Sequence, residues 1–359
     1  MRLNQASRKR LLSQNLKKMP DGGRRPDDAL LHELATATRL NEGPEGVRKI
    51  LRSIYRQGPV PIRDLARDLG IPVPVVAAVR GELEKRGLAE RQAGVVLTEA
   101  GVNALRLASG ITSGDRYDIT AVLDLPDTVS HLVDRFAAIA KGRPDADVRL
   151  DQSHASAETA IRRAVYLYEH DAVEGRSMIF VGDDDLTSIA VGMLAAHLGA
   201  FPRRLCVLDI DDRLVDYISS ASSGLFQVDT FQHDLRDPLP VELESQFDVF
   251  FTDPPYTIDG LRLFVERGVR ALKAVSGKLA FISFGRKSPS ESVDIARTFV
   301  EHDLALIEVT PDFNRYDGAQ LLAGSSQMIR SVYGGRHAEP GQHYAGPLYT
   351  RDRRGSKRD

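Results

Sequence analysis

The chain has 359 residues, of which 42% are hydrophobic and 27% charged, a composition typical of a globular protein long enough for two or more domains. It has no stretch of eighteen apolar residues and no uninterrupted apolar segment near its basic beginning, so we expect no membrane span, no secretory signal and a cytoplasmic location. The single cysteine, Cys206, excludes an internal disulfide, and the lack of Cys and His at zinc-ligand spacing argues against a structural metal.

The net charge of −2 is distributed unevenly along the chain. Residues 1–25 hold eight Lys and Arg against one Asp, and residues 351–359 hold five against two, which leaves 35 basic and 47 acidic residues between them. An acidic body disfavours a nucleic-acid-binding core and favours a small cationic substrate, because its summed field acts on any cleft. Solvated surface charge is the plainer alternative. We assign residues 1–40 to a basic N-terminal extension and residues 341–359 to a basic C-terminal tail.

Residues 41–110 have the pattern of a winged-helix-like domain, in which three helices precede a two-stranded ribbon. Gly70 and Pro72 separate the second helix from the third. Apolar residues recur at helical spacing in the first and third helices, at Val47, Ile50, Leu51 and Ile54 and at Val75, Val76, Val79 and Leu83. The third helix of such a fold would enter the DNA major groove, but its only cations here are Arg80, Lys85 and Arg86. We therefore expect a module for packing or dimerisation, with DNA recognition as the alternative.

Residues 111–150 are predicted to form a connector with one helix, N-capped by Asp127. The pattern then changes, and residues 151–340 alternate apolar runs with amphipathic segments. The runs lie at 177–182, 204–210, 225–231, 247–253 and 278–284, with helices expected near 186–199, 212–222 and 259–274. This alternation predicts an α/β domain whose parallel sheet is covered on both faces. Further strands at 304–310 and 327–334 would complete a seven-stranded Rossmann-like sheet.

Four of the predicted strands end in polar residues, at the edge of the sheet where such folds bind ligands. Gly182-Asp183-Asp184-Asp185 follows the first strand, and Asp209 and Asp234 follow the second and third. By position, Asp209 would accept the hydroxyls of a ribose and Asp234 the amine of an adenine. Because the first turn, which begins at Gly182, lacks a glycine-rich phosphate cradle, these positions favour an S-adenosyl ligand over a nucleotide.

The three consecutive carboxylates in the first turn bear on the choice of ligand. They would repel the carboxylate of intact S-adenosylmethionine by about 4 kcal/mol for each close pair at an effective dielectric of about 20. Decarboxylated S-adenosylmethionine has lost that group and would be attracted through its free amine. The alternative is that one residue, Asp185, caps the following helix while Asp183 and Asp184 are solvated.

The fourth strand is followed by Asp253-Pro254-Pro255-Tyr256, a turn that suits an amine nucleophile. Carboxylate and carbonyl oxygens accept N–H groups, proline keeps the turn rigid, and the tyrosine ring can face a cation. Any enzyme that alkylates nitrogen could use such a turn, and a proline-rich stop after a strand is the plainer alternative.

These segments resemble the branched-chain polyamine synthases, the N4-bis(aminopropyl)spermidine synthase family. The similarity lies in DQSHASAETAIRRA, FVGDDDLTSIA, CVLDIDDRLVDYI, FDVFFTDPPYTIDGLRLFVERGVRALK and NRYDGAQLLAGSSQMI, which span residues 150–335. The resemblance implies a sheet of the class I methyltransferase and spermidine synthase type, preceded by a winged-helix-like domain. It implies transfer of an aminopropyl group from decarboxylated S-adenosylmethionine, as co-substrate, to the secondary amine of spermidine or a related polyamine. The products would be a branched polyamine and methylthioadenosine, and no tightly bound cofactor is expected. We also expect a homodimer.

The expected chemistry assigns roles to the site residues. Asp184 or Asp185 would take the proton of the attacking amine, while Asp183 and Asp253 hold the amine ends of donor and acceptor. Gln152 would line the donor pocket, as the resemblance implies. Substrate contacts are expected from the turn after the fourth strand and from the segment between the last two strands, at Pro254, Tyr256, Tyr316 and Asp317.

Three other functions remain open at the level of the sequence. An N-methyltransferase that uses intact S-adenosylmethionine would need a glycine-rich first turn and a basic face. A 3-amino-3-carboxypropyl transferase would need a cation near the donor carboxylate, for which Arg286 is the candidate beside a strand end. A transcription factor that senses a polyamine would need a DNA-binding N-terminal module.

Overall fold

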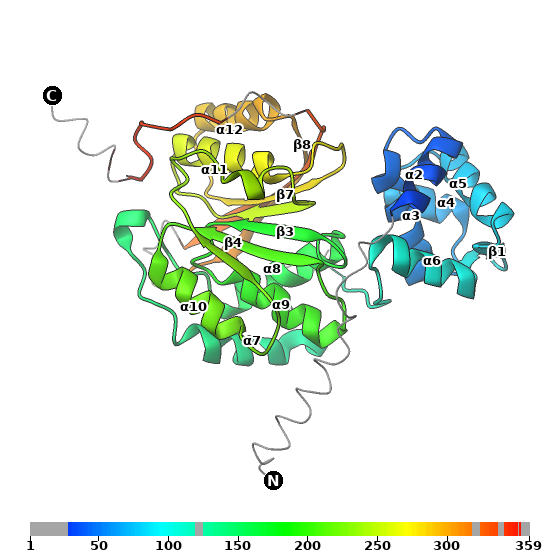
Figure 1. Cartoon of the computed structure of the whole chain (residues 1–359), viewed down its shortest axis with the longest axis horizontal. Coiled ribbons are helices and arrows are strands. Elements are labelled where there is room, and N and C mark those ends of the chain that lie inside the picture. Colours follow the sequence, from blue (N-terminus) through cyan, green and yellow to red (C-terminus); the bar gives the residue numbers. More distant parts are fainter. Residues whose placement is uncertain (1–27, 119–124, 318–323, 337–340, 351, 353–359) are drawn as a thin grey trace, which may run out of the picture.

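The computed structural model describes residues 28–118, 125–317, 324–336, 341–350 and 352. Most of the predicted basic extension and the part of the predicted tail after 352 lie outside the described residues. The described chain forms a smaller N-terminal unit and a larger unit built around a seven-stranded sheet, as Figure 1 shows.

The N-terminal unit contains helices α2 (Ala29–Thr38), α3 (Gly43–Gln57), α4 (Ile62–Leu69), α5 (Val73–Lys85) and α6 (Glu99–Ser109), with the ribbon strands β1 (Ala89–Arg91) and β2 (Val95–Leu97) before α6. The expected order of three helices and a ribbon runs from α3 to β2. Gly70 ends α4 in the left-handed conformation, with φ of 66°. The apolar stripes on α3 and α5 belong to one hydrophobic core, which also includes residues of β2. The winged-helix classification of this unit stays a prediction.

The cations of α5 are neutralised by glutamates of the same unit. Arg80 lies 3.2 Å from Glu84, Lys85 lies 2.7 Å from Glu82, and Arg86 pairs with Glu82 as well. A helix that reads DNA needs free positive charge to meet phosphates. The pairing on α5 therefore weakens the DNA-recognition alternative.

All seven predicted strands are present, in the sheet order β5-β4-β3-β6-β7-β9-β8. The parallel strands are β3 (Ser177–Val181), β4 (Arg204–Asp209), β5 (Asp229–Gln232), β6 (Val249–Thr252) and β7 (Leu279–Phe284). The last two, β8 (Leu304–Arg315) and β9 (Ser325–Tyr333), pair antiparallel to each other, and β9 is antiparallel to β7. The sequence pattern did not predict this reversal, because an apolar run does not encode its direction.

Helices cover both faces of the sheet. One face packs against α7 (Asp127–Ala140), α8 (Ala157–Glu169), α9 (Thr187–Leu198) and α10 (Asp212–Ser222), and the other against α11 (Ile258–Ala271) and α12 (Pro289–Glu301) (Figure 1). The short 3₁₀ segments η1 (Val148–Leu150) and η2 (Val241–Leu243) complete the unit. The prediction that Asp127 caps α7 is wrong: Pro126 takes the N-cap position, and Asp127 is the first helical residue.

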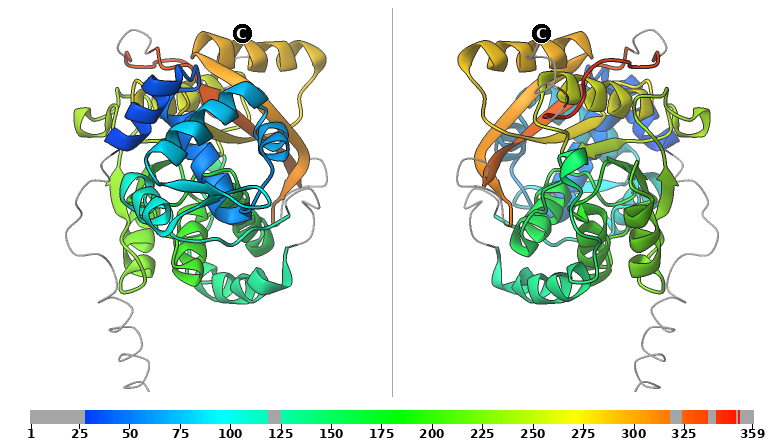
Figure 2. Two further views of the ribbon diagram at one scale, coloured as in Figure 1. Left: turned by 90° about the vertical axis from the view of Figure 1, so that its right-hand side faces the viewer. Right: turned by 90° about the vertical axis from the view of Figure 1, so that its left-hand side faces the viewer.

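The two ends of the sheet have different neighbours. The N-terminal unit contacts residues just before β3 and β7, at the amino ends of these strands, whereas the C-terminal segment crosses the opposite end (Figures 1 and 2). Ligand sites of such sheets lie at the carboxyl ends. The N-terminal unit is therefore attached away from the expected site.

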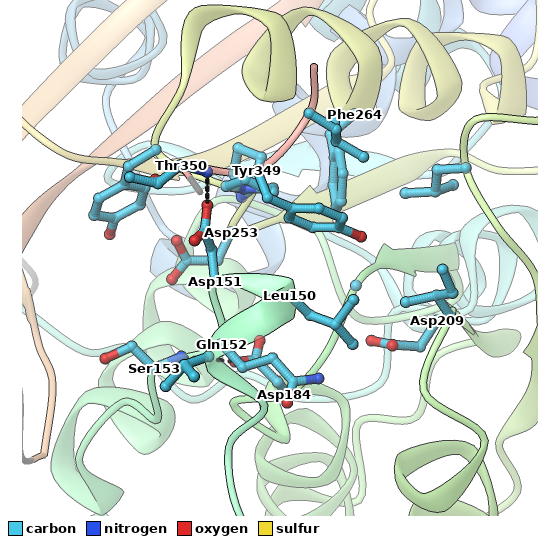
Figure 3. Close-up of a pocket in the computed structure, with 18 of the residues that line it drawn as sticks. Leu150, Asp151, Gln152, Ser153, Asp184, Asp209, Asp253, Phe264, Tyr349 and Thr350 are labelled. Carbon is cyan, nitrogen blue, oxygen red and sulfur yellow. Dashed lines mark hydrogen bonds between the residues drawn. The ribbon is translucent and has the colours of Figure 1, made fainter. Parts of the chain in front are cut away.

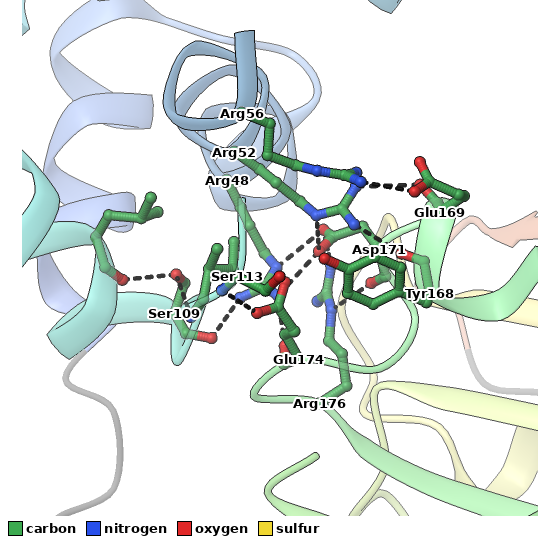
Figure 4. Close-up of polar contacts among 12 residues, drawn as sticks. Arg48, Arg52, Arg56, Ser109, Ser113, Tyr168, Glu169, Asp171, Glu174 and Arg176 are labelled. Carbon is green, nitrogen blue, oxygen red and sulfur yellow. Dashed lines mark hydrogen bonds and ion pairs between the residues drawn. The ribbon is translucent and has the colours of Figure 1, made fainter. Parts of the chain in front are cut away.

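Buried ion pairs join the two units (Figure 4). Asp171, which follows α8, accepts from Nε and Nη2 of Arg48 on α3, each at 2.9 Å, and from Nη2 of Arg176 at 2.8 Å. Nε of Arg52, one turn along α3, lies 3.5 Å from the same carboxylate. Burial alone would raise the pKa of Asp171, but the three guanidinium groups hold it well below its usual range.

A second group of buried charges lies beside the first. Glu45 on α3 accepts from Arg176 at 2.8 Å and from Lys278 at 2.6 Å, and Lys278 also donates to Asp248 at 2.8 Å. Burial opposes ionisation of Glu45, yet Arg176 and Lys278 lower its pKa to about 2. The sequence analysis missed this face of α3, because it assigned packing to the apolar stripe alone.

We predict that Asp171→Asn destabilises the protein by about 3–5 kcal/mol, since it leaves buried guanidinium groups without their counter-charge. Urea denaturation at pH 7 measures the loss. Asp64→Asn is the matched control, because Asp64 pairs with Arg67 at 3.1 Å on the surface, where the two side chains are 44% and 72% exposed, and such a pair contributes less than about 1 kcal/mol. A lowered pKa gives stability that is present above the unfolded value, so the difference between wild type and Asp171→Asn should shrink below about pH 4. Equal losses in the two variants would contradict this interpretation.

Candidate active site

A cavity of about 470 Å³ opens at the carboxyl ends of the parallel strands (Figure 3). Its walls come from the ends of β3, β4, β5 and β6, from residues 148–153 and from residues 348–350. Five aspartates line it: Asp151, Asp184, Asp209, Asp234 and Asp253. No Lys or Arg lines it in the described part of the chain. The cavity is thus a negatively charged site with apolar walls.

The three aspartates of the first turn point in different directions. Gly182 begins the turn with φ of 75°. Asp183 faces the protein, where it accepts from the backbone N–H of Ser188 at 3.2 Å and from the Ser188 hydroxyl. Asp185 is also turned inward and accepts from the backbone N–H of Ala155 and from Arg163. Asp184 is the member of the three that lines the cavity.

This arrangement corrects two expectations for the first turn. The carboxylate that bonds to the first turn of α9 is that of Asp183, whereas the sequence alternative gave this role to Asp185. The expectation that Asp183 holds an amine end of a ligand has no support in the structure, because Asp183 is 3% exposed and lies outside the cavity wall.

Burial raises the pKa of two carboxyl groups in this turn. Burial raises the pKa of Asp183 to about 8, although its bonds to Ser188 oppose the change. Burial also raises the pKa of Asp184 well above its usual value, and the charges of Asp185, Asp253 and Asp209 add to this effect. A carboxylate with a raised pKa beside a cavity is suited to accept a proton from a bound amine.

Asp253 is held at the cavity by an arginine and two tyrosines. Its Oδ2 accepts from Nη2 of Arg163 at 2.6 Å and from the hydroxyl of Tyr316 at 2.6 Å. The hydroxyl of Tyr256 donates to that of Tyr316 at 2.8 Å. Burial raises the pKa of Asp253 to about 7, against the opposing charge of Arg163. Pro254, Tyr256 and Tyr316 all line the cavity, so the structure brings these expected substrate contacts together.

The expected nucleoside contacts lie on the other side of the cavity. Asp209 accepts from the backbone N–H groups of Asp183 at 3.0 Å and Asp211 at 2.9 Å, and it lines the cavity. Asp234 lines the cavity too, while its two oxygens face Arg236. The side-chain oxygen of Gln152 accepts from the backbone of Asp147 at 2.7 Å, so its amide orders the cavity wall.

Two residues considered in the sequence analysis lie outside the cavity. Asp317 is exposed, and its backbone N–H bonds to His154. Gly318, the next residue of the segment between the last two strands, is outside the described residues. Arg286 is 63% exposed and pairs with Asp312, so it is not placed to meet a donor carboxylate.

Several residues of the site were missed from the sequence. Leu348, Tyr349 and Thr350 form part of the cavity wall, although the sequence analysis assigned them to a basic tail. The backbone N–H of Thr350 donates to Asp151 at 2.7 Å (Figure 3), and the hydroxyl of Thr257 donates to the carbonyl of Leu348 at 2.8 Å. A short segment held through backbone groups has no periodic pattern that sequence analysis could detect.

Arg163 is the other missed residue. It lies on α8 with a side chain that is 0% exposed, and Ala164 and Val165 follow it in sequence. A charged residue on the apolar face of a helix was the available signal, because a buried guanidinium needs partners.

Among the described residues, no group of three or more His, Cys, Asp or Glu is arranged to hold a metal ion. The helices in the same part of the chain are too short or too polar to cross a membrane.

The chain is similar to known proteins of one family. A model of the branched-chain polyamine synthase A C-terminal domain matches residues 131–340. An uncharacterized protein of Methanocaldococcus jannaschii is 35% identical over 84% of this chain and 77% of its own length. The N(4)-bis(aminopropyl)spermidine synthase of Thermococcus kodakarensis is 31% identical over 75% of this chain and 77% of its own length.

Among solved structures, the branched-chain polyamine synthase of Thermus thermophilus, in complex with N4-aminopropylspermidine and 5'-methylthioadenosine, is similar to this chain. The two share 25% identity with a TM-score of 0.55, over 91% of this chain and 98% of that chain. The matched range of the family model includes the acidic first turn and the turn at Asp253 that form the cavity. The chain belongs to the branched-chain polyamine synthase family.

Proposed function

We propose that this protein transfers an aminopropyl group from decarboxylated S-adenosylmethionine to an amine of a spermidine-like polyamine. The observation that carries the proposal is the cavity lined by five aspartates, with no Lys or Arg in its described walls. A polyamine and the decarboxylated donor are both cations, so each gains from this charge. The carboxylate of intact S-adenosylmethionine would be repelled, which disfavours methyl and 3-amino-3-carboxypropyl transfer.

The reaction needs an uncharged amine in line with the donor's propyl carbon. The amine nitrogen attacks that carbon, the carbon–sulfur bond breaks, and the sulfur keeps the electron pair as the thioether of methylthioadenosine. One proton leaves the nitrogen. We assign this proton to Asp184, because Asp185 bonds to Ala155 and Arg163 through both of its oxygens.

The other cavity residues would position the two substrates. Asp253 would hold an ammonium group of the acceptor, and the ring of Tyr256 would face the cationic chain. Asp209 and Asp234 would meet the ribose and adenine of the donor. The names of the relatives support the proposed pair of substrates: one is an N(4)-bis(aminopropyl)spermidine synthase, and a solved relative holds N4-aminopropylspermidine and methylthioadenosine. A homodimer and a cytoplasmic location remain predictions.

The donor preference is the first test. Incubation of the protein and spermidine with decarboxylated or intact S-adenosylmethionine, followed by mass analysis, should give an aminopropylated polyamine and methylthioadenosine from the decarboxylated donor. We expect at least about a hundredfold preference, since each close carboxylate pair costs about 4 kcal/mol before screening. Comparable turnover of the intact donor would exclude aminopropyl transfer as the main activity.

The second test concerns the proton acceptor. Asp184→Asn should reduce kcat by about 10²–10⁴-fold, the range of a positioned general base. Raising the pH should restore part of the rate, because more of the free amine is then deprotonated. Asp183→Asn is the matched control in the same turn: its oxygen can still accept from Ser188, so kcat should stay within about tenfold of wild type. The assignment fails if Asp183→Asn is the more damaging change.

The third test separates binding from proton transfer. Asp253→Asn should mainly raise the apparent KM for the polyamine, because it removes an attraction present in the ground state. A high polyamine concentration should therefore recover much of the rate, and raising the pH should recover less than in Asp184→Asn. Initial rates at two pH values measure both effects. A loss confined to kcat would assign Asp253 to the chemical step instead.

A further inference from the structure

The guanidinium of Arg163 connects three parts of the active site from behind the cavity wall. Its Nε donates to Asn314 at 2.8 Å, Nη1 donates to Asp185 at 2.5 Å, and Nη2 donates to Asp253 at 2.6 Å. Nη1 also lies 3.2 Å from the hydroxyl of Thr187. All three nitrogens thus have acceptors, which come from the first turn with the start of α9, from the end of β6 and from β8.

A closed ring of hydrogen bonds runs from Arg163 back to the same carboxylate. The side-chain amide of Asn314 donates to the Ser326 hydroxyl at 2.9 Å, and Ser326 lies 2.9 Å from the Tyr316 hydroxyl. Tyr316 then donates to Asp253, which Arg163 also contacts. Five side chains on α8, β6, β8 and β9 therefore fix one another.

The direction of the bonds follows from the available hydrogens. Tyr316 has one hydroxyl hydrogen and gives it to Asp253, so it accepts from Tyr256. Ser326 accepts from Asn314 and gives its own hydrogen to Tyr316. Every bond of the ring is therefore directed toward Oδ2 of Asp253, and within the described residues its Oδ1 has no protein donor. That oxygen is left for a ligand in the cavity.

Arg163 bonds to two of the three neighbouring carboxylates. Both oxygens of Asp185 are bonded to protein groups, and one oxygen of Asp253 is occupied. Asp184 has no bond to Arg163 and accepts from the backbone N–H of Ser153 at 3.2 Å. Arg163 thus compensates Asp185 and Asp253 directly and makes no bond to the carboxylate of Asp184.

We propose that Arg163 is a positioning residue: it neutralises Asp185 and aims Asp253 at the acceptor, so that Asp184 is the carboxylate that receives the proton. This inference rests on the proposed function for its reaction step. Arg163 is outside the cavity wall and acts through these aspartates.

Removal of the guanidinium charge should change the proton affinity of the whole cluster. Asp184 is faced by Asp185 in its own turn, by Asp253 after β6, by Asp209 after β4 and by Arg143 from the segment before η1. Of these groups, Arg143 is the cation, and it contacts the carbonyl of Asp184. Loss of Arg163 would leave the carboxylates to repel one another, and they would hold protons to higher pH.

The experiment compares Arg163→Gln, which removes the charge, with Arg163→Lys, which keeps the charge but cannot reach three acceptors at once. Arg163→Gln should move the acidic limb of the kcat/KM profile upward by at least about one pH unit and reduce kcat by more than about a hundredfold. Arg163→Lys should keep the limb near its wild-type position and reduce kcat by about ten- to a hundredfold. The KM for the donor should change by less than about threefold in both, since its nucleoside is held by other residues.

Arg162→Gln is the matched control on the same helix. Its guanidinium donates to the carbonyl of Phe313 at 3.0 Å and to Glu158 at 2.5 Å. Arg162→Gln can lower the melting temperature, but the dependence of kcat/KM on pH should stay as in the wild type. The proposal is overturned if Arg163→Gln lowers stability and keeps the wild-type profile. If Arg163→Gln does not fold, Arg163→Lys decides, and a wild-type kcat in that variant overturns the proposal.

A measurement without turnover separates this proposal from the proposed function. Carboxyl-carbon NMR titration of wild type and Arg163→Lys follows the aspartates directly, and titration of Arg163→Gln adds the effect of the lost charge. In Arg163→Gln at least one carboxyl should titrate about one pH unit higher, and unchanged titrations would overturn the role of Arg163. If the wild type shows no turnover but the titrations of the variant are shifted, the role of Arg163 stands. That result would reject only the proposed donor or acceptor of the aminopropyl group.

Discussion

A carboxylate that leaves water needs a cation or several hydrogen-bond donors, and the two ends of this sheet meet that need differently. At the amino ends, Asp171 is surrounded by Arg48, Arg52 and Arg176, and its pKa is held well below the usual range. At the carboxyl ends, the carboxylate of Asp184 accepts from a backbone N–H and, among the described contacts, from no cationic side chain, and its pKa is raised. The same residue type thus stabilises the junction of the two units and gives the cavity its unbalanced charge. Under the proposed function, the substrates would supply the missing cations, and the site would be complete only when they are bound.

The sequence predicted the sheet, its strands and the acidic edge correctly, because apolar runs and polar strand ends are local patterns. It could not assign the individual aspartates. Asp183, Asp184 and Asp185 are adjacent in sequence and equal in type, and their roles depend on a turn that sends Asp183 toward Ser188 and Asp185 toward Arg163. Those partners come from different elements, and no spacing along the chain specifies them. The antiparallel direction of β9 and the cavity contacts of residues 348–350 escaped prediction for the same reason.

The family relationship concerns the type of reaction, and the charge of the cavity concerns the type of ligand. Membership of the family gives the type of reaction to test, whereas the cavity gives the physical reason that a cation would bind there. The acceptor is less constrained, since the chain is 35% identical to an uncharacterized relative and 31% identical to a named synthase. Under the proposed function, Tyr256 and Tyr316 would distinguish polyamines of different length or branching, because both line the cavity beside Asp253, the proposed contact of the acceptor.

The attachment of the N-terminal unit has a consequence for how this protein could evolve. Its buried charges hold the amino ends of β3 and β7, about one strand length from the cavity. Substitutions in the cavity therefore leave these contacts intact, and the fold can tolerate the loss of stability that new pocket residues often bring. Descendants of such a chain could exchange one amine acceptor for another through changes in a few loops, while the scaffold that carries the loops is inherited unchanged.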